Sequence, residues 1–140
     1  MNARSARTSE EVDLARRRVV EAEREYQRDP EDYITRKVRD ATVVDAYRNG
    51  LLSSRELSDL VKDLGRRNVV GLQRRAITRR DVVPGGMLDP ADALRASGLD
   101  PRDFILAVRE GRIRPVEVGG GVRAFRAEDV DHLRLPSEAG

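Results

Sequence analysis

The sequence predicts a mostly α-helical protein in which a helical bundle is followed by a small α+β module. Five segments begin with residues typical of helix N-termini, and they are spread over the whole chain. Charged residues make up 37% of the 140 residues and aromatic residues only 4%, which favours short helices around small cores over one thick sandwich. Near the C-terminus, Gly119-Gly-Gly121 separates two short segments rich in valine, and this pattern predicts a β-hairpin.

The starts of the helices can be recognised in the sequence because they combine several capping signals. Thr8–Glu11 and Ser53–Glu56 have the capping-box form, in which a hydroxyl and a carboxylate three residues later satisfy each other's backbone N–H groups. Three further starts read Asp-Pro-x-Asp, beginning at Asp29, Asp89 and Asp100. In each, the first aspartate is expected to cap, and proline suits the first helical position, where no donor is needed.

The first helix is expected over about 9–27 and the second over about 30–48, ending at Asn49-Gly50. Apolar residues of the first helix recur at spacings of three and four, which is typical of a heptad seam. The seam consists of Val12, Ala15, Val19, Ala22 and Tyr26. Packing on the chain's own next helix and a homodimer through this N-terminal helix are equally compatible with it.

Residues 53–79 form a candidate helix-turn-helix. Two short helices would share a leucine and valine core, and residues 64–80 carry six arginines and no acid. The alternative is one continuous helix weakened by Gly65 and Gly71. Arginine and glutamine reach guanine and adenine edges, and flanking arginines hold phosphates. The residues predicted to contact DNA here are Arg66, Arg67, Asn68, Gln73, Arg74 and Arg75.

A linker is predicted over 81–87, where Pro84 is followed by Gly85-Gly86. It divides the chain into a helical N-terminal domain, 1–80, and a second domain, 88–140. The basic excess lies in the first of these: residues 1–80 hold 19 basic and 14 acidic side chains, whereas 81–140 hold 8 and 11.

The second domain is expected to run helix, turn, helix, strand, glycine turn, strand, helix. Its ordered motifs are Gly98-Leu99-Asp100, Arg109-Glu110-Gly111-Arg112, Val118-Gly119-Gly120 and Glu128-Asp129-Val130. In this order they resemble the winged helix-turn-helix of the excisionase and MerR-like DNA-binding families, over about residues 88–134. The predicted fold is therefore an N-terminal helical bundle with a helix-turn-helix, followed by a winged helix-turn-helix.

The resemblance implies that the second helix of this module enters a DNA major groove and that the wing touches the backbone or minor groove beside it. By position it assigns DNA contacts to Arg102, Arg109, Arg112, Arg123 and Arg126. The chain departs from the family pattern at the helix face, where it has Asp103, Ile105 and Leu106, and at the wing tip, where it has Gly121. An exposed Ile105/Leu106 pair would suit thymine methyl groups or a protein interface.

Other function classes have little support in the sequence. The chain has no cysteine, which excludes thiolate chemistry and suits a reducing compartment. Its only histidine, His132, stands among aspartates at the C-terminal end, where a surface role is the simpler interpretation. We expect no enzyme activity, no cofactor, no metal, no membrane span and a cytoplasmic location.

The expected function is sequence-specific binding of double-stranded DNA by a transcriptional regulator, a repressor of the phage immunity type. Its two modules would hold an extended or asymmetric site, because joining two readers in one chain raises their effective concentration. One alternative is an excisionase-like architectural factor for site-specific recombination. Another is a protein-interaction adaptor that uses the 12–26 seam and the Ile105/Leu106 pair and binds DNA only incidentally.

Overall fold

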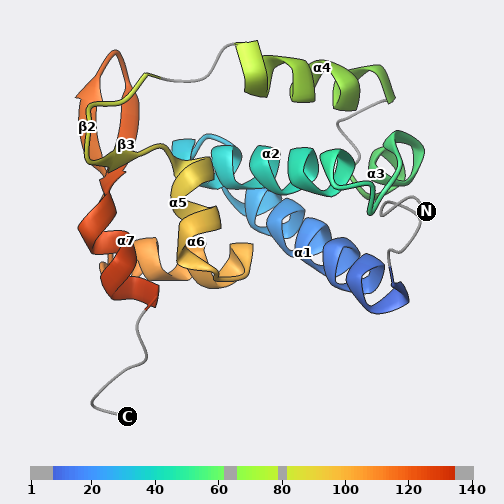
Figure 1. The fold of residues 1–140 in the computed structure, drawn as a ribbon, viewed down its shortest axis with the longest axis horizontal. Helices are drawn as coiled ribbons and strands as arrows, with labels where there is room; N and C mark the ends of the chain where they lie inside the picture. The colour runs from blue at the N-terminus through green and yellow to red at the C-terminus, as the bar shows by residue number, and fades with distance from the viewer. Residues whose placement is uncertain (1–7, 62–65, 79–81, 135–140) are drawn as a thin grey trace, which may run out of the picture.

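The structure is a computed structural model that describes residues 8–61, 66–78 and 82–134. Within those ranges the helices are α1 (Ser9–Arg28), α2 (Tyr33–Arg48), α3 (Ser54–Leu60), α4 (Arg66–Thr78), α5 (Pro90–Ser97), α6 (Pro101–Arg109) and α7 (Ala127–Arg134). The strands are β1 (Met87–Leu88), β2 (Val116–Gly119) and β3 (Val122–Arg126), which form one antiparallel sheet in the order β1-β3-β2. The mostly helical class with a small sheet is thus confirmed (Figure 1).

Both predicted capping boxes are present. The Thr8 hydroxyl accepts from the Glu11 backbone N–H while the Glu11 carboxylate accepts from that of Thr8, and Ser53 and Glu56 do the same at the start of α3. The prediction for α2 was wrong at its first turn. Asp29 belongs to the end of α1, where its backbone N–H donates to Tyr26, and α2 is capped by Asp32, whose carboxylate accepts from the Thr35 N–H.

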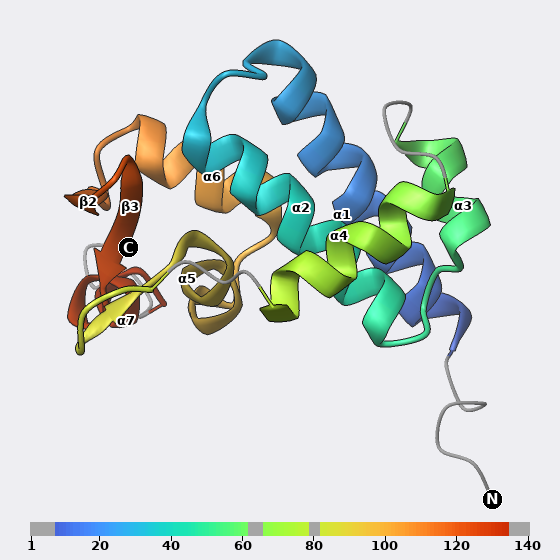
Figure 2. The same ribbon diagram turned by 90° about the horizontal axis from the view of Figure 1, so that it is seen from above.

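The apolar seam of α1 packs inside the chain. Ala15, Val19 and Ala22 are buried, and α1 lies against α2 along its length (Figures 1 and 2). A homodimer through this seam is therefore not supported, because its central residues are already buried within the chain. A short helix of this kind gains its stability from such tertiary contacts rather than from its own propensity.

A buried cation also joins α1 to α2. Arg39 of α2 is 6% exposed, donates to the Glu23 carboxylate at 2.8 Å and to Asp40 at 2.9 Å, and stacks over the Tyr26 ring at 4.1 Å. Burial by itself would lower the pKa of Arg39, but Asp40 and Glu23 outweigh it and raise that pKa above its ordinary value. The ion pair between Arg39 of α2 and Glu23 of α1 therefore fixes the register of the two helices.

α3 and α4 are two separate helices, so the alternative of one continuous helix is wrong. α3 ends at Leu60, and Val61 has the extended angles φ −116° and ψ 97°. Leu57, Val61 and Val69 are buried together with Val19 in one core cluster. The predicted turn between the two helices, residues 62–65, lies outside the described residues.

The C-terminal module has the expected order of elements. Gly98 stops α5 in the left-handed conformation, with φ 71°, and Gly119, Gly120 and Gly121 all have positive φ in the turn between β2 and β3. One strand was missed. Met87, expected in the linker, begins β1, which pairs with Arg126 of β3, because two residues are too few to show a periodic pattern.

α2 takes part in both core clusters of the described residues. Its first half, with Ile34 and Val38, packs with the C-terminal module around Phe104 and Phe125, whose rings meet edge to face at 5.4 Å. Its second half packs with α1, α3 and α4. The packing thus crosses the predicted linker at 81–87, and the division into domains 1–80 and 88–140 stays a prediction.

A bidentate ion pair reinforces this junction. Arg95 of α5 donates to both oxygens of Asp45 on α2, at 2.9 and 2.8 Å. The hydrogen bond to Asp45 is the main reason that the pKa of Arg95 is raised above its ordinary value.

Among the described helices, none has the length and apolar character that crossing a membrane requires.

Candidate nucleic-acid interface

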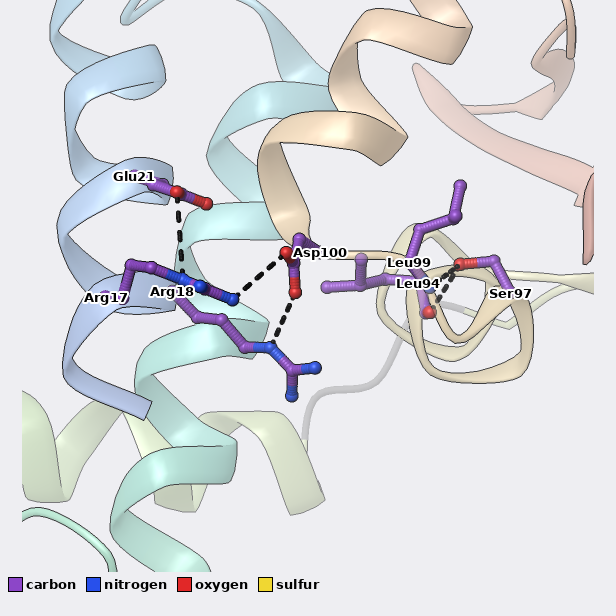
Figure 3. Close-up of polar contacts among 7 residues, drawn as sticks. All are labelled: Arg17, Arg18, Glu21, Leu94, Ser97, Leu99 and Asp100. Carbon is purple, nitrogen blue, oxygen red and sulfur yellow. Dashed lines mark hydrogen bonds and ion pairs between the residues drawn. The ribbon is translucent and has the colours of Figure 1, made fainter. Parts of the chain in front are cut away.

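The turn between α5 and α6 positions the helix that the resemblance assigns to the DNA groove. The Ser97 hydroxyl donates to the Leu94 carbonyl at 2.7 Å and accepts from the Leu99 N–H at 3.1 Å, and these two hydrogen bonds close the turn (Figure 3). Leu99 packs against the core of the module. The start of α6 is therefore fixed by local hydrogen bonds on one side and by apolar packing on the other.

Asp100 occupies the N-cap position of α6, but its side chain does not cap the helix, contrary to the prediction. Its carboxylate makes no hydrogen bond to the first turn of α6 and instead accepts from Arg18 Nε at 2.9 Å and Arg17 Nη2 at 3.3 Å (Figure 3). Asp89, which has the same Asp-Pro-x-Asp context, does cap α5 by accepting from the Asp92 N–H at 2.8 Å. The carboxylate at the start of α6 therefore binds two arginines of α1 instead of the backbone of its own helix.

The expectation that Ile105 is exposed was wrong. Its side chain is 1% exposed and belongs to the core cluster with Ile34 and Val38 of α2. The solvent-facing stripe of α6 contains instead Arg102, Asp103 and Arg109, which are exposed, and Leu106, which is half-buried. The N-terminal bundle thus covers one flank of α6 and leaves a narrower face open.

Arg109, at the C-terminal end of α6, is partly used inside the protein. Its Nη1 lies 2.6 Å from Glu25 Oε1 on α1, and the Glu25 side chain is 1% exposed. Arg28 donates to the other Glu25 oxygen at 3.2 Å. Arg112 follows α6 and pairs at the surface with Glu110, at 3.1 Å. A carboxylate this deeply buried needs a cation nearby, so Arg109 has a structural role whatever else it contacts.

The wing presents its two predicted arginines to solvent. Arg123 and Arg126 are exposed, and both lie on β3. Arg123 stands directly opposite Glu117 of β2, so an acidic side chain shares its face of the hairpin. The glycine tip, 119–121, carries no side chain that could interfere with a close approach to a phosphate backbone.

α4 displays the upstream basic residues. Asn68, Arg74 and Arg75 are exposed and Gln73 is half-buried, while Val69 faces the core. The backbone of Arg66 and Arg67 forms the first turn of α4, and their side chains lie outside the described set.

The predicted residues form two groups rather than one surface. α6 and the wing belong to the same module, whereas α4 lies on the opposite side of α2 from α6, as both views show (Figures 1 and 2). The sequence did not reveal that α1 is a neighbour of α6. The run Arg16-Arg17-Arg18 was the available signal, although a run of charge does not reveal its partner.

The comparisons with known proteins add no relative to this geometry. No family model matches the chain, and neither the curated proteins nor the solved structures contain a significant match. The arrangement of α5, α6, β2, β3 and α7, together with the charges on it, is therefore the basis for any assignment of function.

Proposed function

We propose that this chain is a sequence-specific regulator of transcription that binds double-stranded DNA through its C-terminal module. The observation that carries the proposal is the pair of helices α5 and α6, followed by the hairpin β2–β3, with Arg102 and Arg123 exposed on α6 and the wing. This order resembles that of the winged helix-turn-helix of the excisionase and MerR-like families. In that arrangement α6 enters the major groove and the hairpin lies beside it.

The open face of α6 has suitable chemistry for reading base edges. Arg102 offers a forked donor set that suits the two acceptors of guanine, and it makes no hydrogen bond or ion pair with any described residue. Asp103 can accept from the amino group of cytosine, and Leu106 can contact a thymine methyl group. Three adjacent side chains of different chemistry can discriminate sequence, whereas a uniformly basic face would not.

Repression is the simplest consequence of such binding, because a protein seated on a promoter excludes polymerase. A repressor of the phage immunity type is the setting we propose. The adaptor alternative has less support than before, since Ile105 and the 12–26 seam, on which it depended, pack within the chain.

The second candidate function is an architectural factor that bends DNA for recombination. The position of α4 favours it. Because α4 lies on the opposite side of α2 from α6, a duplex that contacts both helices would have to bend around α2, or a second duplex would be needed (Figures 1 and 2). Bending a site of 20–30 base pairs by 40–90° costs about 1–6 kcal/mol, which additional phosphate contacts can offset.

Selection of bound sites from a random duplex library tests the proposal. The full chain should enrich one sequence, and that sequence placed in a promoter should lower transcription when the protein is present. Dependence of recombination direction on the protein, with no change in transcription, would favour the architectural function. A library that stays random after repeated selection would contradict both.

A further inference from the structure

α1 runs parallel to α6 and follows it from end to end. Near the start of α6, Arg18 Nε lies 2.9 Å from the Asp100 carboxylate, and at its end Arg109 Nη1 lies 2.6 Å from Glu25. The order of the partners along both helices is the same, so the two helices point in one direction. Figures 1 and 2 both show α1 and α6 as neighbours on the same side of α2.

Three arginines of α1 form one stripe next to α6. Arg17, Arg24 and Arg28 are spaced by seven and four residues, which places them on one helix face. Both ends of the stripe are tied to α6: Arg17 reaches Asp100 at 3.3 Å, and Arg28 shares the Glu25 carboxylate with Arg109. Arg24 lies between them, so the stripe borders α6 along its length.

The dimensions of DNA determine what such a stripe would meet. The major groove is about 12 Å wide, and a helix with its side chains is about 10–12 Å across, so one helix fills it. A parallel neighbour at the usual interaxial distance of about 8–10 Å cannot enter the same groove. It lies over the sugar-phosphate strand that borders the groove.

We propose that α1 is part of the DNA interface, with Arg17, Arg24 and Arg28 binding the phosphates of the strand that borders the groove entered by α6. The inference rests on the proposed function and adds a second helix to its site. α6 supplies contacts to bases, and α1 supplies contacts to the backbone that fix the orientation of α6.

The charges on this face leave arginines available for phosphates. Glu25 is buried and shared by Arg28 and Arg109, and Asp100 is shared by Arg17 and Arg18. Arg24 is exposed and has no hydrogen-bond or ion-pair partner among the described residues. The Arg17 and Arg28 side chains are 55% and 62% exposed, so part of each guanidinium is open to a phosphate while its ion pair is kept. Glu21, 4.0 Å from Arg17, opposes binding at one point of the stripe.

Arg24→Ala and Arg24→Glu in the full chain test this assignment, with Arg16→Ala as the control. Arg16 lies on the same helix and carries the same charge, but its partners are Asp13 and Glu56 of α3, away from α6. Affinity is measured by fluorescence anisotropy on the selected duplex and on a scrambled one, between about 50 and 200 mM salt, where phosphate contacts have a measurable slope.

Arg24→Ala should weaken binding to both duplexes by the same factor, about threefold to tenfold, and reduce the slope of log K against log salt by about 0.9. Arg24→Glu should weaken both further, while Arg16→Ala binds as the unmodified protein does. Equal behaviour of the Arg24 and Arg16 variants would overturn the role of α1, as would a loss confined to the selected duplex. If the unmodified protein does not distinguish the two duplexes, the proposed function fails instead, independently of Arg24.

Discussion

Glu25 Oε1 of α1 lies 2.6 Å from Arg109 Nη1 of α6, in a chain where these residues are separated by 84 positions. Glu25 is almost completely buried, whereas the Arg109 side chain is 38% exposed. The pair therefore neutralises a carboxylate within the packing of α1 on α6 while leaving one side of the guanidinium open. It connects the stability of the N-terminal bundle to the helix that we propose reads DNA.

Arg109→Ala should consequently lower the free energy of unfolding by about 1–3 kcal/mol, because it removes a cation from a buried carboxylate whose other partner among the described residues is Arg28. Urea denaturation of the full chain measures this. Arg112→Ala is the matched control, since its pair with Glu110 is exposed and should contribute less than about 1 kcal/mol. Substituting Glu25→Gln as well should recover part of the loss; a purely additive double mutant would argue against the coupling.

Two of the three Asp-Pro-x-Asp motifs, those beginning at Asp89 and Asp100, should respond differently to the same substitution. Asp89→Ala removes a side-chain cap from α5 and should cost about 0.5–2 kcal/mol, with little dependence on salt. Asp100→Ala removes ion pairs that are partly exposed, and its smaller cost, below about 1 kcal/mol, should decline further as salt is added. Denaturation curves at low and high salt distinguish these outcomes. Equal costs with equal salt dependence would mean that Asp100 caps α6 after all.

Substitutions of the adjacent apolar residues Ile105 and Leu106 on α6 should have different costs in stability, because the first is buried and the second is half-buried. Ile105→Ala leaves a cavity between α6 and α2 and should destabilise the protein by about 2–5 kcal/mol. Leu106→Ala truncates a half-buried side chain and should cost clearly less, while changing affinity at a thymine-containing position of the selected site. Thermal unfolding and binding assays measure the two effects. A mild effect of Ile105→Ala would place that side chain outside the core.

What the sequence predicts well is local. Capping at Thr8, Ser53 and Asp89 depends on residues three positions apart, so the pattern and the hydrogen bonds coincide. The glycine turn at 119–121 is similarly local, because three consecutive residues take positive φ.

What it predicts poorly depends on distant partners. Asp100 has the same local context as Asp89 but gives up its capping role to arginines 82 and 83 positions away. Ile105 was expected on the exposed face of its helix, and it is buried because α2 lies against it. In both cases the partner is distant in the sequence from the residue whose environment it determines.

α4 offers a separate test of how many DNA surfaces the chain uses. If α4 binds phosphates on a bent or second duplex, Arg75→Ala should weaken binding to a long duplex and leave binding to a short duplex that covers only the α6 site unchanged. An equal loss of affinity for the long and the short duplex on Arg75→Ala would place α4 and α6 on one continuous site.

Arg74→Ala and Arg102→Ala should each cost about 1–3 kcal/mol of specific binding where they contact bases, and each should relax a different part of the site.

The central claim, that α6 discriminates DNA sequence, is tested most directly by the ratio of affinities for the selected and scrambled duplexes at physiological salt. For the unmodified chain this ratio should be at least about a thousand. Arg102→Ala should reduce it by about fivefold to 150-fold while the folded state keeps its stability, because the exposed side chain contacts bases and not the core. A ratio near one for the unmodified chain, or a ratio that Arg102→Ala does not change, would contradict the account.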